Sequence, residues 1–148
     1  MYNLVKRQAE VELLPMAEAN GIGVIPYSPA AAGLLSGKYL GQATGRLKTN
    51  KMYEARYGDA WMFEVAEEYV AFCKERGLHP VSTAIAWVGA HPAVTAPIIG
   101  ARNLEQLKDS LASVKVDMTL SLRAEIADLS RTPAPATDRT EELKVVKR

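Results

Sequence analysis

The order of apolar and polar positions divides the first part of the chain into a helix, a strand and a long loop. Residues 11–21, "VELLPMAEANG", predict a short helix that ends at Asn20-Gly21. The run "GVIPY" that follows is short, apolar and partly β-branched, which is typical of a buried strand. Residues 28–58 contain no periodic segment, so we expect a long connection of the kind that often binds ligands or forms lids.

The second part of the chain reads as helices around one further strand. Met62, Val65, Ala66, Tyr69, Phe72 and Cys73 recur at helical spacing and form one apolar stripe. The predicted elements are, in order, a helix from Asp59 to Gly77, a helix opened by Pro80, a strand at Ala96 to Ile99, and helices over about 103–113 and 122–129.

Two buried strands separated by helices predict a parallel βαβ arrangement of the α/β class. Both strands are apolar on both faces, as strands are inside a larger parallel sheet. Two strands cannot close a barrel, and a doubly wound sheet normally has more of them. We therefore expect this chain to form part of a larger structure, with exposed strand edges that favour pairing with another chain.

Composition limits the class of protein. The chain has 148 residues and a net charge of +1, which suits one domain and predicts neither a nucleic-acid surface nor an electrostatic membrane dock. The single Cys73 fits a reducing compartment, and no apolar run approaches the roughly 20 residues that cross a bilayer. We expect a soluble cytoplasmic domain over residues 1–130, followed by a mobile tail over 131–148.

The second predicted strand leads into a candidate phosphate site. In "IIGARNLEQLKDSL", Gly100 permits a tight turn, Arg102 carries a fixed positive charge, and Asn103 with Gln106 has capping-box spacing. The N-terminus of a helix beside an arginine suits a phosphate group. The alternative is a plain turn and cap with a solvated arginine.

The first predicted strand leads into a second candidate site. Tyr27 offers a flat ring for stacking, and Ser28, the amides of Gly33 to Gly37, and Lys38 suit a pyrophosphate. The alternative is a core tyrosine followed by a flexible loop. Because ligands of parallel α/β proteins gather at the carboxyl ends of strands, two such loops together favour a binding site.

Three blocks of sequence resemble the C-terminal half of an aldo-keto reductase. They are the segment from Tyr2 to Tyr39, "GRLKTNKMYEARYGD", and "PIIGARNLEQLKDSL", in the family's order. The resemblance extends to Leu129 and implies part of a (β/α)8 TIM barrel, an α/β fold, with Val24 to Tyr27 as strand seven and Ala96 to Ile99 as strand eight. Family members are NADPH-dependent oxidoreductases that reduce aldehydes and ketones.

The resemblance assigns residues to the cofactor. Tyr27 matches the aromatic residue that stacks on the nicotinamide. The loop over the pyrophosphate corresponds to Ser28, Pro29, Ala30, Gly33, Ser36 and Lys38, and the segment for the adenosine 2′-phosphate and adenine corresponds to Gly100, Arg102, Gln106, Asp109 and Ser110. Where the family often has asparagine this chain has Ser110, whose hydroxyl reaches less far toward the adenine amino group. Arg102 favours NADP over NAD, because a guanidinium suits a 2′-phosphate.

The family's catalytic Asp, Tyr, Lys and His are not among the residues matched here, since the resemblance places them in the N-terminal half. His79 and His91 flank a helix next to prolines and are interpreted as cap or surface residues. We therefore expect a segment that binds the cofactor without catalysing reduction alone, unless a complementary N-terminal half completes it. Two other hypotheses are a non-catalytic nucleotide-binding or interaction module and a truncated product without function.

Overall fold

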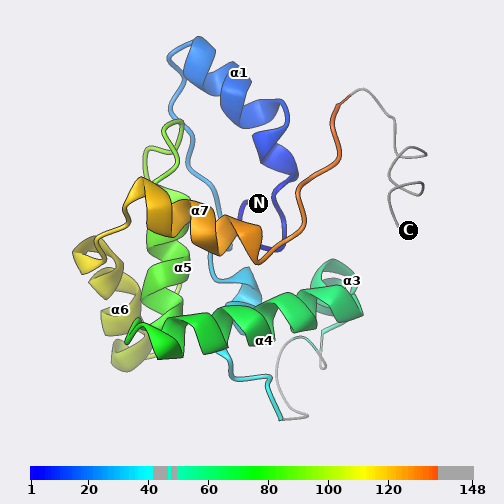
Figure 1. The fold of residues 1–148 in the computed structure, drawn as a ribbon, viewed down its shortest axis with the longest axis vertical. Coiled ribbons are helices and arrows are strands. Elements are labelled where there is room, and N and C mark those ends of the chain that lie inside the picture. Colours follow the sequence, from blue (N-terminus) through cyan, green and yellow to red (C-terminus); the bar gives the residue numbers. More distant parts are fainter. Residues whose placement is uncertain (42–46, 48–49, 137–148) are drawn as a thin grey trace.

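The computed structural model describes residues 1–41, 47 and 50–136, and within them the chain is helical. Helix α5 packs against α4, α6, η2 and η3 and stands upright between the ends of α4 and α7 in Figure 1. The elements are, in order, η1 Gln8–Glu10, α1 Leu13–Ala19, η2 Ala31–Ser36, α3 Lys51–Tyr57, α4 Ala60–Glu75, α5 Pro80–Gly89, α6 Leu104–Leu111, η3 Ala112–Lys115 and α7 Leu120–Asp128, where η marks a 3-10 helix.

The helices predicted from periodicity and caps are confirmed. Gly21 and Gly77 follow α1 and α4 with φ of 65° each, the left-handed conformation that ends a helix at low cost for glycine. Pro80 is the first residue of α5, and Asn103 caps α6. Five of the six stripe residues of α4 are buried, and Phe72 is half-buried. Asp59 stands at the N-cap position of α4 but makes no side-chain cap bond.

The expectation of a loop without helices over residues 28–58 is wrong where that segment is described. It contains η2 and α3, while residues 42–46 and 48–49 lie outside the described part of the chain. Helix α3 begins at Asn50, whose side chain accepts a hydrogen bond from the Met52 amide, and Tyr57 is its one buried residue. A helix that buries a single side chain has no apolar stripe, so periodicity cannot reveal it.

The predicted pair of parallel strands in a partial TIM barrel is also wrong. No strand or sheet forms among the described residues, and only isolated parallel bridges join Val24 to Val94 and Tyr27 to Ile98. The Val24 amide donates to the Ala93 carbonyl at 3.2 Å, and the Thr95 amide donates to the Val24 carbonyl at 2.9 Å. The two segments therefore lie in the expected orientation, but without a continuous ladder.

Prolines explain why the ladder stops. Pro26 and Pro97 lie between the two bridges and have no N–H group to donate. The register also shifts by one residue, since Tyr27 is three residues beyond Val24 whereas Ile98 is four beyond Val94. Apolar and β-branched residues predict extended strands in these runs, but this pattern does not take into account the N–H groups that the two prolines lack.

A buried cluster ties the N-terminal segment to α5 and α7. The Tyr2 hydroxyl donates to Glu10 Oε1 at 2.7 Å and accepts from Arg123 Nη2 at 3.0 Å. Trp87 Nε1 donates to the Arg123 carbonyl at 3.0 Å, and its ring centroid lies 5.3 Å from that of Tyr2. Burial and the bond to Glu10 raise the pKa of Tyr2 well above its usual range, so this phenol remains a donor at physiological pH.

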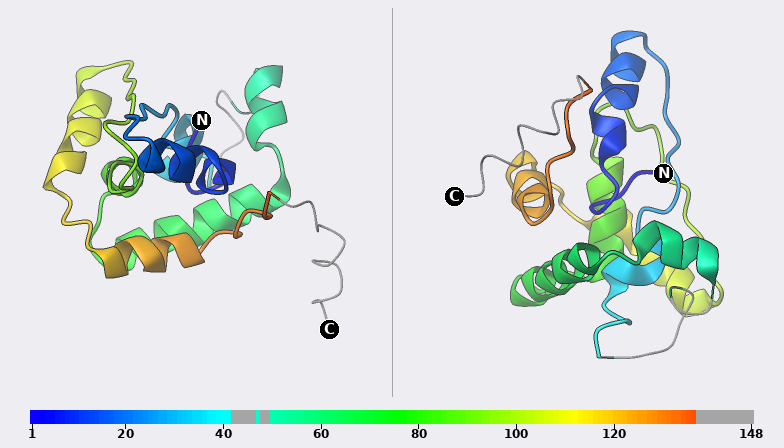
Figure 2. Two further views of the ribbon diagram at one scale, coloured as in Figure 1. Left: turned by 90° about the horizontal axis from the view of Figure 1, so that it is seen from above. Right: turned by 90° about the vertical axis from the view of Figure 1, so that its right-hand side faces the viewer.

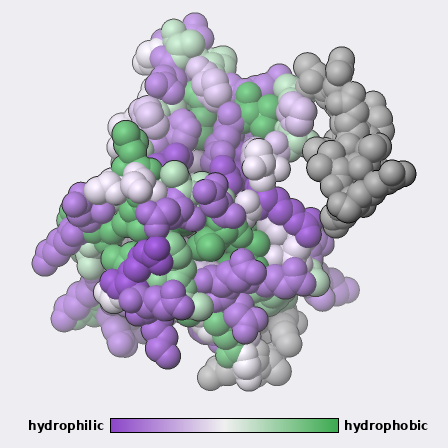
Figure 3. All heavy atoms as spheres, viewed as in Figure 1, coloured by the Kyte–Doolittle hydropathy of each residue, from purple (hydrophilic) through white to green (hydrophobic). Residues whose placement is uncertain are grey.

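Helix α7 runs alongside α4, with Arg76 at the end of α4 paired to Glu125 at 2.7 Å (Figure 2). On the face shown in Figure 3, apolar side chains remain visible among polar ones, so the surface is not uniformly polar. Among the described residues no helix is long and apolar enough to cross a membrane.

The two tryptophans give a test of this packing. Trp87 is 1% exposed and hydrogen-bonded, whereas Trp61 is only partly buried. We expect Trp87→Ala to lower the free energy of unfolding by about 3–5 kcal/mol, the usual cost of emptying a buried aromatic site. Trp61→Ala, the matched control, costs less, as measured by urea unfolding. An equal or larger loss for Trp61→Ala contradicts the assignment of Trp87 to the core.

Candidate functional site

A cleft of about 650 Å³ brings together all twelve residues predicted to contact a cofactor. One wall is the loop that follows Tyr27, and the other is the segment that leads into α6, with the start of α5 at one end. The predicted residues that line it are Tyr27, Ser28, Pro29, Ala30, Gly33, Ser36, Lys38, Gly100, Arg102, Gln106, Asp109 and Ser110.

The parallel pairing explains why residues so distant in sequence share one cleft. The Ile98 amide donates to the Pro26 carbonyl at 2.8 Å, so the two loops begin side by side at Tyr27 and Ile98. Asn3, fully buried, donates from Nδ2 to the Ser28 carbonyl at 2.9 Å and so fixes the start of the first loop. Tyr27 is 45% exposed and lines the cleft, so a ligand there can reach it.

The first loop holds an unusual amount of backbone strain. Ser28, Ala31 and Ala32 have φ of 60°, 51° and 57°, and Gly33 follows with φ of 90°. Side chains disfavour this left-handed region, at a cost of about 1 kcal/mol or more for each residue. Strain of this kind persists where the surroundings fix the backbone, and it concentrates at binding sites. The loop therefore has a defined, strained backbone in this structure.

Lys38 folds back over Gly33 within this loop. A Cβ atom added at Gly33 would lie 2.6 Å from Lys38 Nζ, closer than real contacts allow, so only glycine leaves room for the ammonium group in this position. Ser36 Oγ donates to the Gly33 carbonyl at 2.7 Å and braces the same turn. The arrangement places a positive charge against a tight backbone turn, which is the kind of surroundings that a phosphate oxygen requires.

The opposite wall combines helix capping with the positive charge of Arg102. Asn103 accepts from the Gln106 amide at 2.9 Å, and Gln106 Oε1 accepts from the Arg102 amide at 3.1 Å. The predicted capping role of Asn103 and Gln106 is thus confirmed, and both residues also line the cleft. Gly100 has no left-handed φ, and a Cβ there meets nothing within 4 Å, so this glycine borders open space and no tight turn requires it.

The far end of the cleft contains a residue that the sequence reading treated only as a cap. His79 caps α5 by accepting from the Ser82 amide, as expected, but it also lines the cleft beside Asp109. Tyr53, Val81 and Ile85 line the cleft as well and were not singled out. Their sequence signal is weak, because α5 brings His79, Val81 and Ile85 to the site only once it packs on α6.

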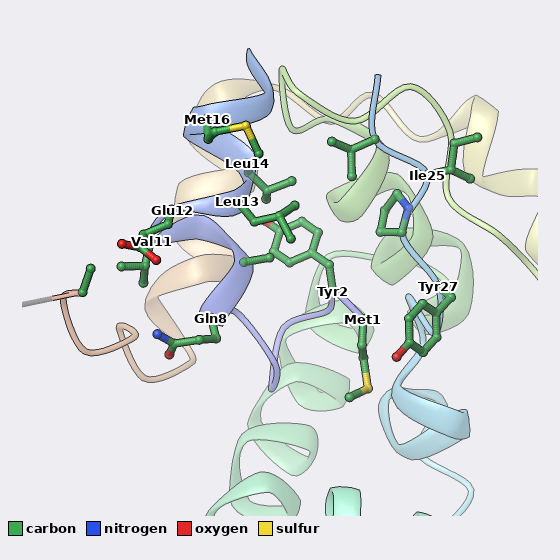
Figure 4. A pocket seen from close by; sticks show the side chains of 14 residues that line it. Met1, Tyr2, Gln8, Val11, Glu12, Leu13, Leu14, Met16, Ile25 and Tyr27 are labelled. Atoms are coloured by element: carbon green, nitrogen blue, oxygen red, sulfur yellow. The ribbon is translucent and has the colours of Figure 1, made fainter. Parts of the chain in front are cut away.

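A second hollow, of about 950 Å³, lies between α1 and the segment before Tyr27. We call it the α1 groove. Leu13, Leu14 and Met16 of α1 line one wall, Ile25 and Tyr27 line the other, and Figure 4 shows these side chains across the opening. Its side chains carry one charge, that of Glu12, so the groove suits an apolar partner better than a polar ligand. Tyr27 belongs to both the groove and the cleft.

Two features bear on other kinds of chemistry. Cys73 is fully buried, and burial raises the pKa of its thiol, as in an inert packing residue. In the part of the chain that the structure describes, no three His, Cys, Asp or Glu side chains lie close enough to hold a metal ion.

Comparison with known proteins gives the family. The aldo/keto reductase family matches residues 1–130. The chain is 37% identical over 136 residues to the uncharacterized oxidoreductase YrpG of Bacillus subtilis, covering 92% of this chain and 40% of that protein. It is 30% identical over 139 residues to Protein tas of Escherichia coli, covering 90% and 40%. It is also 30% identical over 124 residues to the versiconal hemiacetal acetate reductase of Aspergillus parasiticus, covering 80% and 35%.

The matches cover most of this chain, but the chain spans only about 40% of the length of the first two relatives. The match begins at the first residue and includes both walls of the cleft. The chain belongs to the aldo/keto reductase family.

Proposed function

We propose that this chain is the C-terminal part of an NADP-dependent aldo-keto reductase and that the cleft holds the cofactor. The observation that carries the proposal is the convergence of all twelve residues, selected from two separate stretches of sequence, on one cleft. Its volume of about 650 Å³ lies within the usual range for small-molecule sites.

The charges of the cleft suit the proposed ligand. Lys38, held over Gly33, faces the position expected for the pyrophosphate, and Arg102 on the opposite wall is assigned to the 2′-phosphate. The exposed ring of Tyr27 is assigned to the nicotinamide. In this arrangement Lys38 binds the pyrophosphate and Arg102 binds the 2′-phosphate, so Arg102 selects NADP over NAD.

Bound NADPH supplies a hydride for reduction of a carbonyl group. The residues of this chain would bind and orient the cofactor, and Tyr27 would stack on one face of its nicotinamide ring and leave the other face free for hydride transfer. The family's proton-donating tyrosine and its Asp, Lys and His partners are assigned to the part of the relatives that this chain does not match. We therefore propose that the chain alone binds NADPH and does not reduce carbonyl compounds.

The α1 groove is proposed as the docking surface for that complementary part of the protein. Ile25, Leu13 and Met16 are 61%, 51% and 50% exposed, an unusual exposure for neighbouring large apolar residues. The Tyr2 amide donates to the Tyr27 carbonyl at 3.3 Å at one end of the groove, so polypeptide already pairs with this segment there. In the absence of the complementary part, the same surface favours self-association.

A second candidate function is a non-catalytic nucleotide-binding or interaction module, favoured by the complete cleft and the absence of an assigned proton donor. A third is a truncated product without function, for which the open groove is the supporting observation. Reading the DNA upstream of Met1 for an Asp, Tyr, Lys and His set separates a split reductase from both.

Substitution of Arg102 tests the proposed cofactor. We expect saturable NADPH binding by fluorescence, and a loss of about tenfold or more in affinity for Arg102→Ala, because the 2′-phosphate loses its guanidinium. The affinity for NADH should change little, because NADH lacks that phosphate. Arg131→Ala, outside the cleft, is the matched control. Absence of saturable NADPH binding, or turnover of a carbonyl substrate by the chain alone, contradicts the proposal.

Gly33→Ala tests the assignment of Lys38. The new methyl group collides with Lys38 Nζ and displaces the ammonium group, so NADPH affinity should fall several-fold. Gly77→Ala provides the control, because Gly77 is also left-handed, with φ of 65°, but a Cβ there meets nothing within 4 Å. Both variants pay the backbone strain of about 1 kcal/mol. Equal NADPH affinities for the two variants would remove Lys38 from the site.

The α1 groove is tested by a charge at its centre. Ile25→Lys should shift the chain toward monomer in sedimentation velocity, since a buried unpaired ammonium opposes association. Val114→Lys alters a residue that is 84% exposed and lies outside the groove, so it should leave association unchanged. The docking surface is refuted by a wild-type chain that stays monomeric at all concentrations, or by equal effects of both substitutions.

A further inference from the structure

The far end of the cleft raises the question of which side chains recognise the base. Ser110, 5% exposed, donates its hydroxyl hydrogen to the Gln106 carbonyl at 2.8 Å, an internal bond of α6. The Gln106 side-chain oxygen is committed to the Arg102 amide at 3.1 Å. The Ser110 hydroxyl hydrogen and the Gln106 side-chain oxygen thus each have a partner within the chain. Asp109 and the unassigned His79 remain at this end of the cleft.

His79 and Asp109 are held in fixed relation by Ser82. The Ser82 hydroxyl donates to the Asp109 carbonyl at 2.6 Å, and the Ser82 amide donates to His79 Nδ1 at 3.4 Å. Nδ1 also lies 3.1 Å from the Ser82 hydroxyl oxygen, and in the tautomer in which Nδ1 accepts from the Ser82 amide, the proton of the neutral imidazole is on Nε2. That nitrogen lies 3.8 Å from Asp109 Oδ2. The carboxylate is therefore attracted toward His79 over a distance too long for a direct hydrogen bond, and it keeps its capacity to accept from a ligand.

The surroundings suit a planar base. Val81 and Ile85 of α5, two and six residues after His79, also line the cleft and supply apolar surface. The Asp109 side chain is 39% exposed and that of His79 is 51% exposed, so a ligand can reach both. A carboxylate beside an apolar wall is matched by a base that carries a hydrogen-bond donor on its edge, such as the 6-amino group of adenine.

We propose that His79 is a positioning residue that orients the Asp109 carboxylate toward the 6-amino group of adenine and so makes the site selective for that base. The inference rests on the proposed NADP site and extends it to the N-cap residue of α5, for which neither the sequence nor the family resemblance gives a role at the base. In a hypoxanthine analogue of NADPH, a carbonyl oxygen replaces the amino group and meets the carboxylate with like partial charge.

The test compares NADPH with its hypoxanthine analogue by fluorescence titration of the whole chain. We expect the wild type to prefer NADPH about tenfold, the size of one good base contact. His79→Asn keeps an N-cap acceptor but has no group at the position of Nε2, so the preference should fall to about twofold or less. His79→Gln places an amide near that position and should restore it. His91→Asn, a histidine outside the cleft, should leave the preference unchanged.

A double variant separates positioning from general damage. With Asp109→Asn already present, His79→Asn should change the preference no further, because both act through the same carboxylate. The inference is overturned if the wild type binds NADPH but does not discriminate, or if His79→Asn retains the full preference. Absence of NADPH binding by the wild type instead overturns the proposed function, and this inference with it. Unfolding curves establish that each variant is folded before titration.

Discussion

The short parallel contact between residues 24–27 and 94–98 is the constraint on which the candidate site depends. Three hydrogen bonds of 2.8–3.2 Å hold the two segments, and the last of them sets Tyr27 beside Ile98. The two walls of the cleft begin where this contact ends, and each wall follows one of the two segments. Because Pro26 and Pro97 cannot donate, the contact cannot extend into a ladder, and its stability comes from packing around it.

That packing is supplied by the N-terminal segment and by α5. Asn3 fixes the Ser28 carbonyl, Tyr2 joins Glu10, Arg123 and Trp87, and α5 contributes both Trp87 to the core and His79 to the cleft. One helix thus links the core to the binding surface. Strain in the loop from Ser28 to Gly33 is maintained by these fixed neighbours, which makes the loop a preformed wall.

How well each element could be predicted depends on whether its sequence signal is local or involves residues far apart along the chain. The stripe of α4 and the proline at the start of α5 are local, and the helices they predict form. The strands depended on donors and neighbours across the chain, and two prolines prevented them. Helix α3, with one buried residue, had no stripe to reveal it. The twelve cleft residues were predicted because they lie in two contiguous runs, whereas His79 joins them only through the packing of α5 against α6.

Tyr27 lines both the cleft and the α1 groove, so the proposed cofactor site and the exposed apolar surface adjoin at one residue. The chain spans about 40% of the length of its first two relatives. The central claim is that the paired segments form one NADP site. Amide hydrogen exchange with and without NADPH tests it directly. The account predicts slower exchange in both residues 28–38 and residues 100–110, whereas protection of neither stretch, or of one alone, would contradict it.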